Sequence, residues 1–452
     1  MIDRLVIFGA TGDLTGRFLL EGIAALRAAG ELPGGFSLTG VGREDWDDKR
    51  FGEWAAAQLA RFASGQPEQA RQAVVAAARY RAADVTNPAA VAAAVAGDGN
   101  RPVAVYLALP PAVFPAAVSA LRDAGLPAGS RIVLEKPFGV DLDSAVALNR
   151  LLAEVLPEQA VFRVDHFLAM TTVQNILSSR LANRILESIW NSAHIDLVDI
   201  LWEESLALEG RAGYYDGAGA LKDMVQNHLL QVLCLVAMEP PASLDERDLR
   251  DRKVDVLRSI RPLTDEDVKQ CSRRARYLAG RIGDREIPAY VDEPGVDPAR
   301  QTETFAEVTL KLDNWRWSGT TFRIRAAKAI GGGRREVAVH FREVPMLPAA
   351  AHRESNVLRF GLEPEGLHLE LTGVTGRLGA LGPLTLDTEL APPSLPAYGQ
   401  LLLNVLSHDA SLSIRGDEAE ESWRVVAPVL DGWARGIVPM GGYPAGSQGP
   451  AR

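Results

Sequence analysis

The sequence has few of the features that mark secreted, disulfide-rich or membrane-spanning proteins. Its 452 residues include only two cysteines, Cys234 and Cys271, which is too few for a disulfide framework or a thiolate metal site. There is no apolar run of transmembrane length, and the strand-like start at residues 1–9 argues against a secretory signal. We therefore expect a cytoplasmic protein.

Positive charge is also scarce. Lysine and arginine total 48 against 58 aspartate and glutamate, which gives a net charge of −10, and no basic run stands out. Nucleic acids and anionic membranes are therefore not expected as partners. A chain of this length can bury a large core, and its length is typical of two or three domain-sized units.

The first part of the chain alternates between buried strands and helical patterns. Apolar strands are predicted at residues 5–8, 36–41, 103–109 and 131–134, with helical stretches between them. This alternation predicts a parallel sheet with helices on both faces. We assign residues 1–160 to a Rossmann-type NAD(P)-binding domain.

The second part changes character. Strands are predicted at residues 195–202, 304–312, 322–325, 336–341 and 367–371, with helices at about 221–236 and 398–406. These strands predict a large, mainly antiparallel sheet in an α+β domain over residues 161–440. The glycine- and proline-containing residues 441–452 are expected to form a loose tail.

A glycine-rich turn follows the first predicted strand. Glycines there let the chain turn tightly and let a pyrophosphate approach the N-terminus of the next helix, where free N–H groups favour anions. Its position at the first strand of an alternating pattern predicts a dinucleotide site rather than a plain turn. The predicted contacts are Gly9, Thr11, Gly12, Asp13 and Leu14.

Arg43 follows the second predicted strand, where the adenosine ribose of a dinucleotide lies. An arginine there can pair with the 2′-phosphate of NADP, whereas the next residue, Glu44, suits the ribose hydroxyls of NAD. We expect NADP as the cofactor, with NAD as the alternative.

Two segments carry candidate chemistry, residues 163–168 and 223–230. Histidine is the usual base for removing a hydroxyl proton, and a carboxylate bonded to its other nitrogen fixes the tautomer. His228 and Asp165 are candidates for these roles. Spacing alone does not bring them together, and a histidine in an apolar helix is more often a core residue.

Several longer motifs resemble the glucose-6-phosphate dehydrogenase family. The resemblance extends from about residue 5 to residue 433. The matching motifs are Asp165-His166 followed by Val173-Gln174-Asn175, and the segments 135–139, 183–191, 226–231, 302–305, 313–317 and 398–403.

The resemblance implies oxidation of a sugar at C1, with the hydride passing to NAD(P) and no metal involved. His228 corresponds to the family's base and Asp165 to its carboxylate partner. The resemblance also implies a large sheet that forms a dimer face, hence a homodimer or homotetramer. Residues implied at the sugar are Lys136, His166, Glu204, Asp223, Lys328 and Glu363; further residues implied at the cofactor are Pro110, Glu135 and Lys136.

The chain departs from the family where the sugar phosphate is bound. His166 remains, but Phe167 replaces a tyrosine, Met170 a lysine and Gly333 a basic residue. Glu363 stands in place of a glutamine, and Phe18 in place of a lysine. Because a dianionic phosphate needs charge-assisted hydrogen bonds, these changes predict a glucose without the 6-phosphate, or a 6-substituted one.

Two alternatives stay open. Arg334 or Arg335 could restore the charge, which would make the protein a genuine glucose-6-phosphate dehydrogenase with a rebuilt phosphate site. A non-catalytic dinucleotide-binding regulatory protein is disfavoured, because the four residues of the catalytic pattern are all present: His228, Asp165, Lys136 and Lys328.

Overall fold

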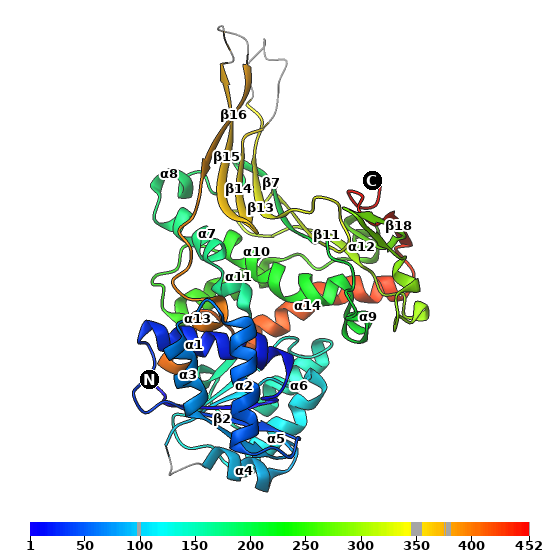
Figure 1. Cartoon of the computed structure of the whole chain (residues 1–452). Helices are drawn as coiled ribbons and strands as arrows, with labels where there is room; N and C mark the ends of the chain where they lie inside the picture. The colour runs from blue at the N-terminus through cyan, green and yellow to red at the C-terminus, as the bar shows by residue number, and fades with distance from the viewer. Residues whose placement is uncertain (97–100, 345–354, 375, 377–380, 452) are drawn as a thin grey trace. The chain divides into compact units, whose positions relative to one another are not determined.

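The computed structural model describes residues 1–96, 101–344, 355–374, 376 and 381–451 (Figure 1). It divides into two compact units. The first comprises Met1–Ala169, Pro241–Asp251 and Pro393–Glu420, and the second comprises Met170–Pro240, Arg252–Pro392 and Glu421–Arg452. The first unit thus runs beyond the predicted boundary at residue 160 and includes two later segments.

The first unit contains a seven-stranded sheet in the order β17-β6-β5-β4-β1-β2-β3. All neighbours are parallel except β17, which runs antiparallel to β6. The predicted NAD(P)-binding fold is confirmed. The strands are β1 (Arg4–Phe8), β2 (Ser37–Gly42), β3 (Ala78–Ala82), β4 (Ala104–Leu107), β5 (Arg131–Glu135), β6 (Val161–Val164) and β17 (Ser413–Ile414).

The longer helices of this unit bury apolar residues in its core, as α2 (Asp48–Phe62) does with Phe51, Ala55 and Leu59. The later helix α13 (Ala397–Ser407) belongs here because its leucines and Val405 join the core around β1 and α1 (Leu20–Ala29). The other helices are η1 (Thr15–Leu19), α3 (Glu68–Ala77), α4 (Pro88–Ala96), η2 (Pro111–Val113), α5 (Phe114–Ala124), α6 (Leu142–Ala153), η3 (Glu158–Ala160) and η4 (His166–Ala169).

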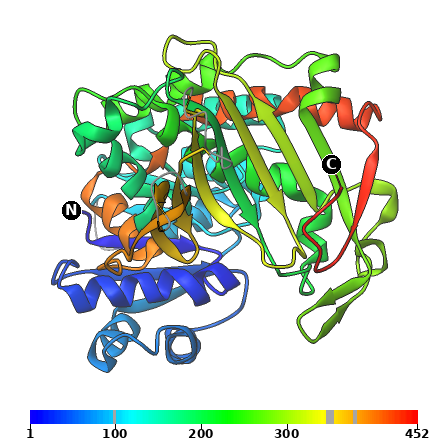
Figure 2. The ribbon, with the colours of Figure 1, turned by 90° about the horizontal axis from the view of Figure 1, so that it is seen from above.

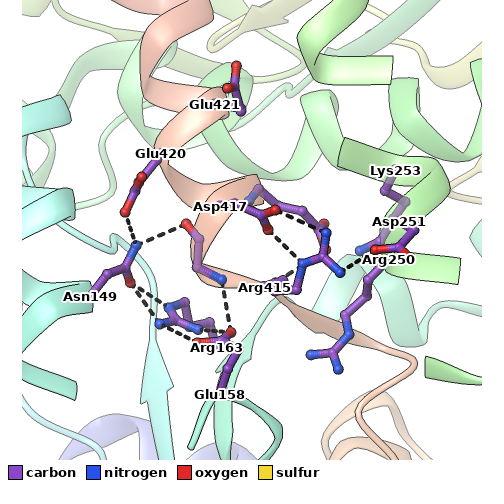
Figure 3. A network of polar contacts seen from close by, with 12 residues as sticks. Asn149, Glu158, Arg163, Arg250, Asp251, Lys253, Arg415, Asp417, Glu420 and Glu421 are labelled. Atoms are coloured by element: carbon purple, nitrogen blue, oxygen red, sulfur yellow. Dashed lines mark hydrogen bonds and ion pairs between the residues drawn. The ribbon is translucent and has the colours of Figure 1, made fainter. Parts of the chain in front are cut away.

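A polar network fixes β6 to the later segment of the first unit (Figure 3). The buried Arg163 donates to Asn149 Oδ1 at 2.7 Å and to Glu158 Oε1 at 2.7 Å. Gly416 N donates to Glu158 Oε1 at 2.9 Å, and Asn149 Nδ2 donates to Gly416 O at 2.9 Å. The network holds the strand that leads directly into Asp165 and His166.

The second unit contains a nine-stranded sheet in the order β16-β15-β14-β13-β7-β12-β11-β8-β18. The predicted mainly antiparallel sheet is confirmed, with parallel pairs at β7–β12 and β8–β18. The strands are β7 (Ile195–Glu203), β8 (Ser272–Leu278), β11 (Phe305–Leu310), β12 (Thr321–Ala327), β13 (Arg335–Phe341), β14 (Val357–Leu362), β15 (Glu365–Val374), β16 (Leu381–Thr388) and β18 (Met440–Pro444).

Helices cover one face of this sheet. η5 contacts β12 and β11, and α7 contacts β14 and β15; from above, the strands lie in front of the helices (Figure 2). None of the helices among the described residues could span a membrane. This unit contains α7 (Thr171–Leu181), α8 (Arg184–Glu187), α9 (Ala212–Ala220), η5 (Leu221–Leu229), α10 (Leu230–Ala237), α12 (Asp265–Cys271), most of α11 (Glu246–Ser259) and most of α14 (Gly416–Ala434). Its small elements are β9 (Gly280–Ile282), β10 (Arg285–Ile287), η6 (Tyr290–Asp292) and η7 (Pro298–Arg300).

The tail that was expected to be loose is paired along much of its length. Residues Met440–Pro444 form β18 against β8. Further on, Gly331 N donates to Ser447 O at 2.8 Å, and Arg273 donates to Ala451 O at 2.6 Å. The glycines allow this close packing of backbones, so the predicted loose tail is wrong for these residues. Arg452 lies outside the described residues.

Candidate active site

The glycine-rich loop follows β1, as predicted. Gly9 has a φ of 82°, and a Cβ there would lie 2.1 Å from the carbonyl oxygen of Ala108. Only glycine fits, because the turn needs the left-handed region and the end of β4 passes close by. Gly9 N donates to Val41 O at 2.9 Å, which fixes the loop at the carboxyl edge of the sheet.

The rest of the loop leaves its backbone accessible. Gly12 and Asp13 are exposed, Thr11 and Leu14 are half-buried, and Leu14 is the N-cap of η1. Asp13 forms an exposed ion pair with Arg17 at 3.3 Å. An exposed loop at the start of a helix, next to the carboxyl ends of parallel strands, fits the pyrophosphate of a dinucleotide.

Arg43 and Glu44 follow the end of β2, and both side chains are exposed. Glu44 is held by further hydrogen bonds. The hydroxyl of the buried Tyr80 donates to the backbone oxygen of Glu44 at 3.1 Å and to its Oε2 at 3.2 Å. Burial acts to raise the pKa of Glu44, but hydrogen bonds from its backbone, Thr11 and Tyr80 outweigh it and lower the pKa. An ionised carboxylate is therefore fixed beside the glycine loop.

Glu135 ends β5 at the same edge of the sheet. The hydroxyl of Tyr106, on the neighbouring strand β4, donates to its carboxylate. Burial raises the pKa of Glu135 to about 7, against smaller effects from Tyr106, Lys136 and Tyr398 that lower it. The next peptide bond, Lys136–Pro137, is cis. Pro110, also predicted at the cofactor, follows β4 and precedes η2.

Asp165 and His166 follow β6. Asp165 is 2% exposed, and its Oδ1 accepts from the Phe167 N–H at 3.0 Å. The His166 ring stacks on Tyr398, with 5.8 Å between centroids and 18° between planes. Phe167 is buried at 3% exposure, so its ring is a core side chain within the first unit.

In the second unit, Glu204 and Lys328 come together because the parallel strands β7 and β12 end side by side. Lys328 Nζ lies 2.5 Å from Glu204 Oε2 and 5.1 Å from the ring centre of Tyr215 on α9. Burial raises the pKa of Tyr215, and the negative charges of Asp223 and Glu204 add to the effect. Glu204, Lys328 and Asp223 therefore surround one tyrosine.

Asp223 and His228 lie on η5, which is a π-helix rather than the predicted α-helix. In an α-helix, residues five apart point about 140° away from each other. In a π-helix, residues five apart are joined by backbone hydrogen bonds and lie on nearly the same side. The π-winding therefore turns Asp223 and the buried His228 toward more similar sides of η5 than α-helical winding would. Asp223 accepts a hydrogen bond from Tyr214 at 3.1 Å.

The loop at residues 331–333 explains why position 333 lacks a basic side chain. A Cβ on Gly333 would lie 2.2 Å from the carbonyl oxygen of Glu203. The next two residues are arginines with carboxylate partners. Arg334 Nε lies 3.4 Å from Glu203 Oε2, and Arg335 Nη1 lies 2.5 Å from Glu363 Oε2. Arg335 thus balances the negative charge of Glu363. The side chain of Arg334 is 50% exposed.

Four residues that shape these sites have no role predicted from the sequence. Tyr80 orients Glu44, Tyr398 stacks on His166, Tyr215 lies among the sugar-side residues, and Glu303 contacts the start of η5. Tyr398 and Glu303 lie inside motifs that were noted, so their sequence signal was available. Tyr80 and Tyr215 carry no local pattern, because their roles depend on tertiary packing.

A dinucleotide-type loop in one unit and a histidine, carboxylates and lysine in the other define an NAD(P)-dependent oxidoreductase acting on a sugar CH–OH group. Two family models match almost the whole chain: "Glucose-6-phosphate dehydrogenase, NAD binding domain" over residues 6–175 and "Glucose-6-phosphate dehydrogenase, C-terminal domain" over residues 177–452. The chain belongs to the glucose-6-phosphate dehydrogenase family.

Individual relatives agree with this assignment. The chain is 39% identical to a glucose-6-phosphate 1-dehydrogenase of Mycolicibacterium smegmatis, covering 98% of this chain and 94% of the relative. It is 35% identical to that of Zymomonas mobilis, covering 100% and 96%. A solved glucose-6-phosphate dehydrogenase in complex with glucose 6-phosphate matches with a TM-score of 0.88 at 30% identity, covering 99% of this chain and 95% of that one.

Proposed function

We propose that the protein is a glucose-6-phosphate 1-dehydrogenase that oxidises C1 of glucose 6-phosphate to the lactone. This was the alternative in the sequence analysis, and the names of the whole-chain relatives support it over a non-phosphorylated sugar. The observation that carries it is the half-exposed Arg334, a cation one residue beyond the glycine that replaces the family's basic residue.

The proposed chemistry begins at the C1 hydroxyl. His228 takes its proton, and Asp165 is the proposed carboxylate that orients His228 and stabilises its protonated form. Glu204 and Asp223 accept hydrogen bonds from sugar hydroxyls, and Lys328 and Lys136 bind near the reacting end. When bound, NADP or NAD would supply the acceptor for the hydride that leaves C1.

The cofactor is held by the first unit. The exposed loop at Gly9, Thr11, Gly12, Asp13 and Leu14 would take the pyrophosphate, and Arg43 would take the adenosine 2′-phosphate. Glu44, fixed by Tyr80, would instead accept hydrogen bonds from the ribose hydroxyls of NAD. The cofactor is NADP or NAD, and we expect Arg43 to favour NADP.

The phosphate end of the sugar would be bound by a changed set of groups. His166 supplies one donor and Arg334 a guanidinium, which is suited to bidentate phosphate binding. Arg334 Nε lies 3.4 Å from Glu203 Oε2, so a bound phosphate would have to compete with this ion pair. Replacing Arg334 by methionine should therefore raise KM for glucose 6-phosphate about 10- to 100-fold, since one charge-assisted hydrogen bond contributes about 1.5–3 kcal/mol.

The matched control is Arg342→Met, since Arg342 is another partly exposed arginine, paired with Asp196 at 3.1 Å. The Arg342→Met variant should keep the parent value of KM for glucose 6-phosphate. An unchanged KM in the Arg334 variant would exclude Arg334 as the phosphate ligand.

A glucose without the 6-phosphate, or with another 6-substituent, is the second candidate. It is favoured by the buried Phe167 ring and by Met170, which offers no charge. The discriminating experiment measures NAD(P)H formation with glucose 6-phosphate and free glucose in parallel, and identifies the lactone by mass spectrometry. Turnover of free glucose alone would establish the second candidate.

We also propose that the protein is a cytoplasmic homodimer or homotetramer. The proposal rests on the family's use of the large sheet as a dimer face. In this chain that sheet carries paired charges, including Arg323 with Asp199 and Arg325 with Glu203. Sedimentation equilibrium that gives only the monomer mass of 48.7 kDa at micromolar concentration would contradict it.

A further inference from the structure

Glu303 lies at the start of η5, the helix that carries Asp223 and His228. Its side chain is buried at 7% exposure. Its Oε1 accepts from the Leu221 N–H at 2.9 Å, and its backbone oxygen accepts from the Ala220 N–H at 3.2 Å. The first N–H groups of a helix have no partner within the helix, so Glu303 satisfies two donors that would otherwise be buried unpaired.

The backbone before η5 is shaped around this carboxylate. Gly219 has a φ of 71° and a ψ of 171°, which separates α9 from η5. A Cβ on Gly219 would lie 2.5 Å from Glu303 Oε1 and 2.7 Å from Oε2. Glycine is therefore required both by the backbone conformation and by the space that the carboxylate occupies.

The same short segment also holds Lys328. Lys328 N donates to Thr304 O at 2.9 Å, directly after Glu303. Tyr215, whose ring lies 5.1 Å from Lys328 Nζ, donates to Glu303 O at 3.5 Å. Residues 303–304 thus connect the start of η5 to two other sugar-side groups of the second unit.

We propose that Glu303 is a positioning residue for the reaction: its carboxyl oxygen fixes the first turn of η5, and thereby the π-winding that places Asp223 and His228 on one side of the helix. A shift of this turn toward α-helical winding would rotate the two residues apart. Misplacing a reacting group by about 1 Å can cost about 100-fold in rate. The inference rests on the proposed role of His228 as the base.

The test compares Glu303→Met, which keeps the volume but removes the acceptor, with Glu303→Gln, which retains an acceptor oxygen. Glu303→Met should lower kcat about 10- to 100-fold, while the dissociation constant of NADP stays within twofold, because the cofactor residues lie in the other unit. Glu303→Gln should retain kcat within about threefold. Rates are measured well below each variant's melting temperature, so that loss of folded protein does not contribute.

The matched control is Glu307→Met, the same substitution four residues later, in β11. Its carboxylate binds Arg325 at 2.7 Å and not η5. This variant should lose stability but keep kcat. A parent-like kcat in Glu303→Met, or an equal loss in Glu303→Gln, would overturn the proposal.

Gly219→Ala provides a second route if Glu303→Met does not fold. The added methyl group would collide with the carboxylate of Glu303 and displace it from the start of η5. The value of kcat should therefore fall, while the affinity for NADP is kept. A parent-like kcat in this variant would also overturn the proposal. The His228→Asn variant separates the two inferences: full activity there removes the proposed base, whereas an inactive His228→Asn beside a fully active Glu303→Met removes only the role of Glu303.

Discussion

The helix η5 and the loop at residues 331–335 belong to the same unit but relate to the family pattern in opposite ways. η5 keeps its motif, buries His228 and is fixed at its start by Glu303. The loop has a glycine where the resemblance implies a basic residue, and the backbone of Glu203 leaves no room for a side chain at Gly333. Under the proposed function, the catalytic helix keeps the family pattern, whereas the recognition of the remote end of the substrate is rebuilt.

The largest loss of activity is expected from a substitution on η5. His228→Asn removes the proposed base and should lower kcat by about 10²–10⁴-fold, the usual contribution of a positioned base. NADP affinity, measured by fluorescence titration, should not change, since His228 is not among the proposed cofactor ligands. A kcat within tenfold of the parent would rule His228 out as the base. Asp165→Asn should be milder, because the base remains in a less favourable tautomer.

Restoring the family's residues in the proposed phosphate site should increase activity rather than decrease it. Phe167→Tyr combined with Met170→Lys adds a hydroxyl and a cation, and should raise kcat/KM for glucose 6-phosphate by about tenfold or more, since each charge-assisted hydrogen bond contributes about 1.5–3 kcal/mol. kcat/KM for free glucose should stay the same or fall. Because Phe167 is 3% exposed, melting temperatures of both single variants serve as controls. A lower kcat/KM for glucose 6-phosphate in stable variants would contradict this view of the site.

Substitutions at the proposed cofactor residues are expected to change KM for NADP or NAD by a smaller factor. Arg43→Ala should raise KM for NADP by about tenfold and leave KM for NAD nearly unchanged, because only NADP carries the 2′-phosphate. Glu44→Gln should weaken NAD instead, and Asp45→Asn is the charge-matched control beside it. Equal changes for both cofactors in the Arg43 variant would show that Arg43 does not bind the phosphate.

The smallest effect on activity is expected from Glu303→Gln, but it has a defined pH signature in stability. Burial, with smaller opposing effects from backbone N–H groups, Arg274 and Lys222, raises the pKa of Glu303 to about 7. The stability due to its protonation is present below the unfolded pKa of about 4.5 and is lost as the pH rises through 7. Glutamine is always neutral, so the variant should gain stability relative to the parent between pH 5 and pH 8, by at most about 3 kcal/mol. Urea denaturation at both pH values measures this difference, and no change with pH would contradict the raised pKa.

The sequence predicted the parts of the structure that local patterns determine. The alternation of apolar strands and helices predicted the first sheet, and the glycine turn after β1 predicted the loop at Gly9. The local strand patterns of the second part of the chain also predicted the large sheet. Family motifs, rather than spacing, selected the candidate residues.

Contacts between segments far apart in the sequence could not be predicted. Helix α13 joins the first unit, although it follows the second sheet in the chain. The tail was expected to be loose because glycine is flexible in isolation, yet its glycines allow close backbone packing against β8 and the 331–333 loop. The first turn of η5 is bonded to Glu303, which lies 82 residues after Leu221 in the sequence.

The central claim is that a rebuilt site still binds the phosphate of the substrate. It is tested most directly by kcat/KM of the unmodified protein on glucose 6-phosphate and on free glucose, with saturating NADP and then NAD. The account predicts that glucose 6-phosphate is favoured by about a hundredfold or more, which corresponds to about 2.7 kcal/mol of transition-state discrimination. An equal or higher kcat/KM for free glucose would contradict it, and would show that the changes at Phe167, Met170 and Gly333 removed phosphate recognition.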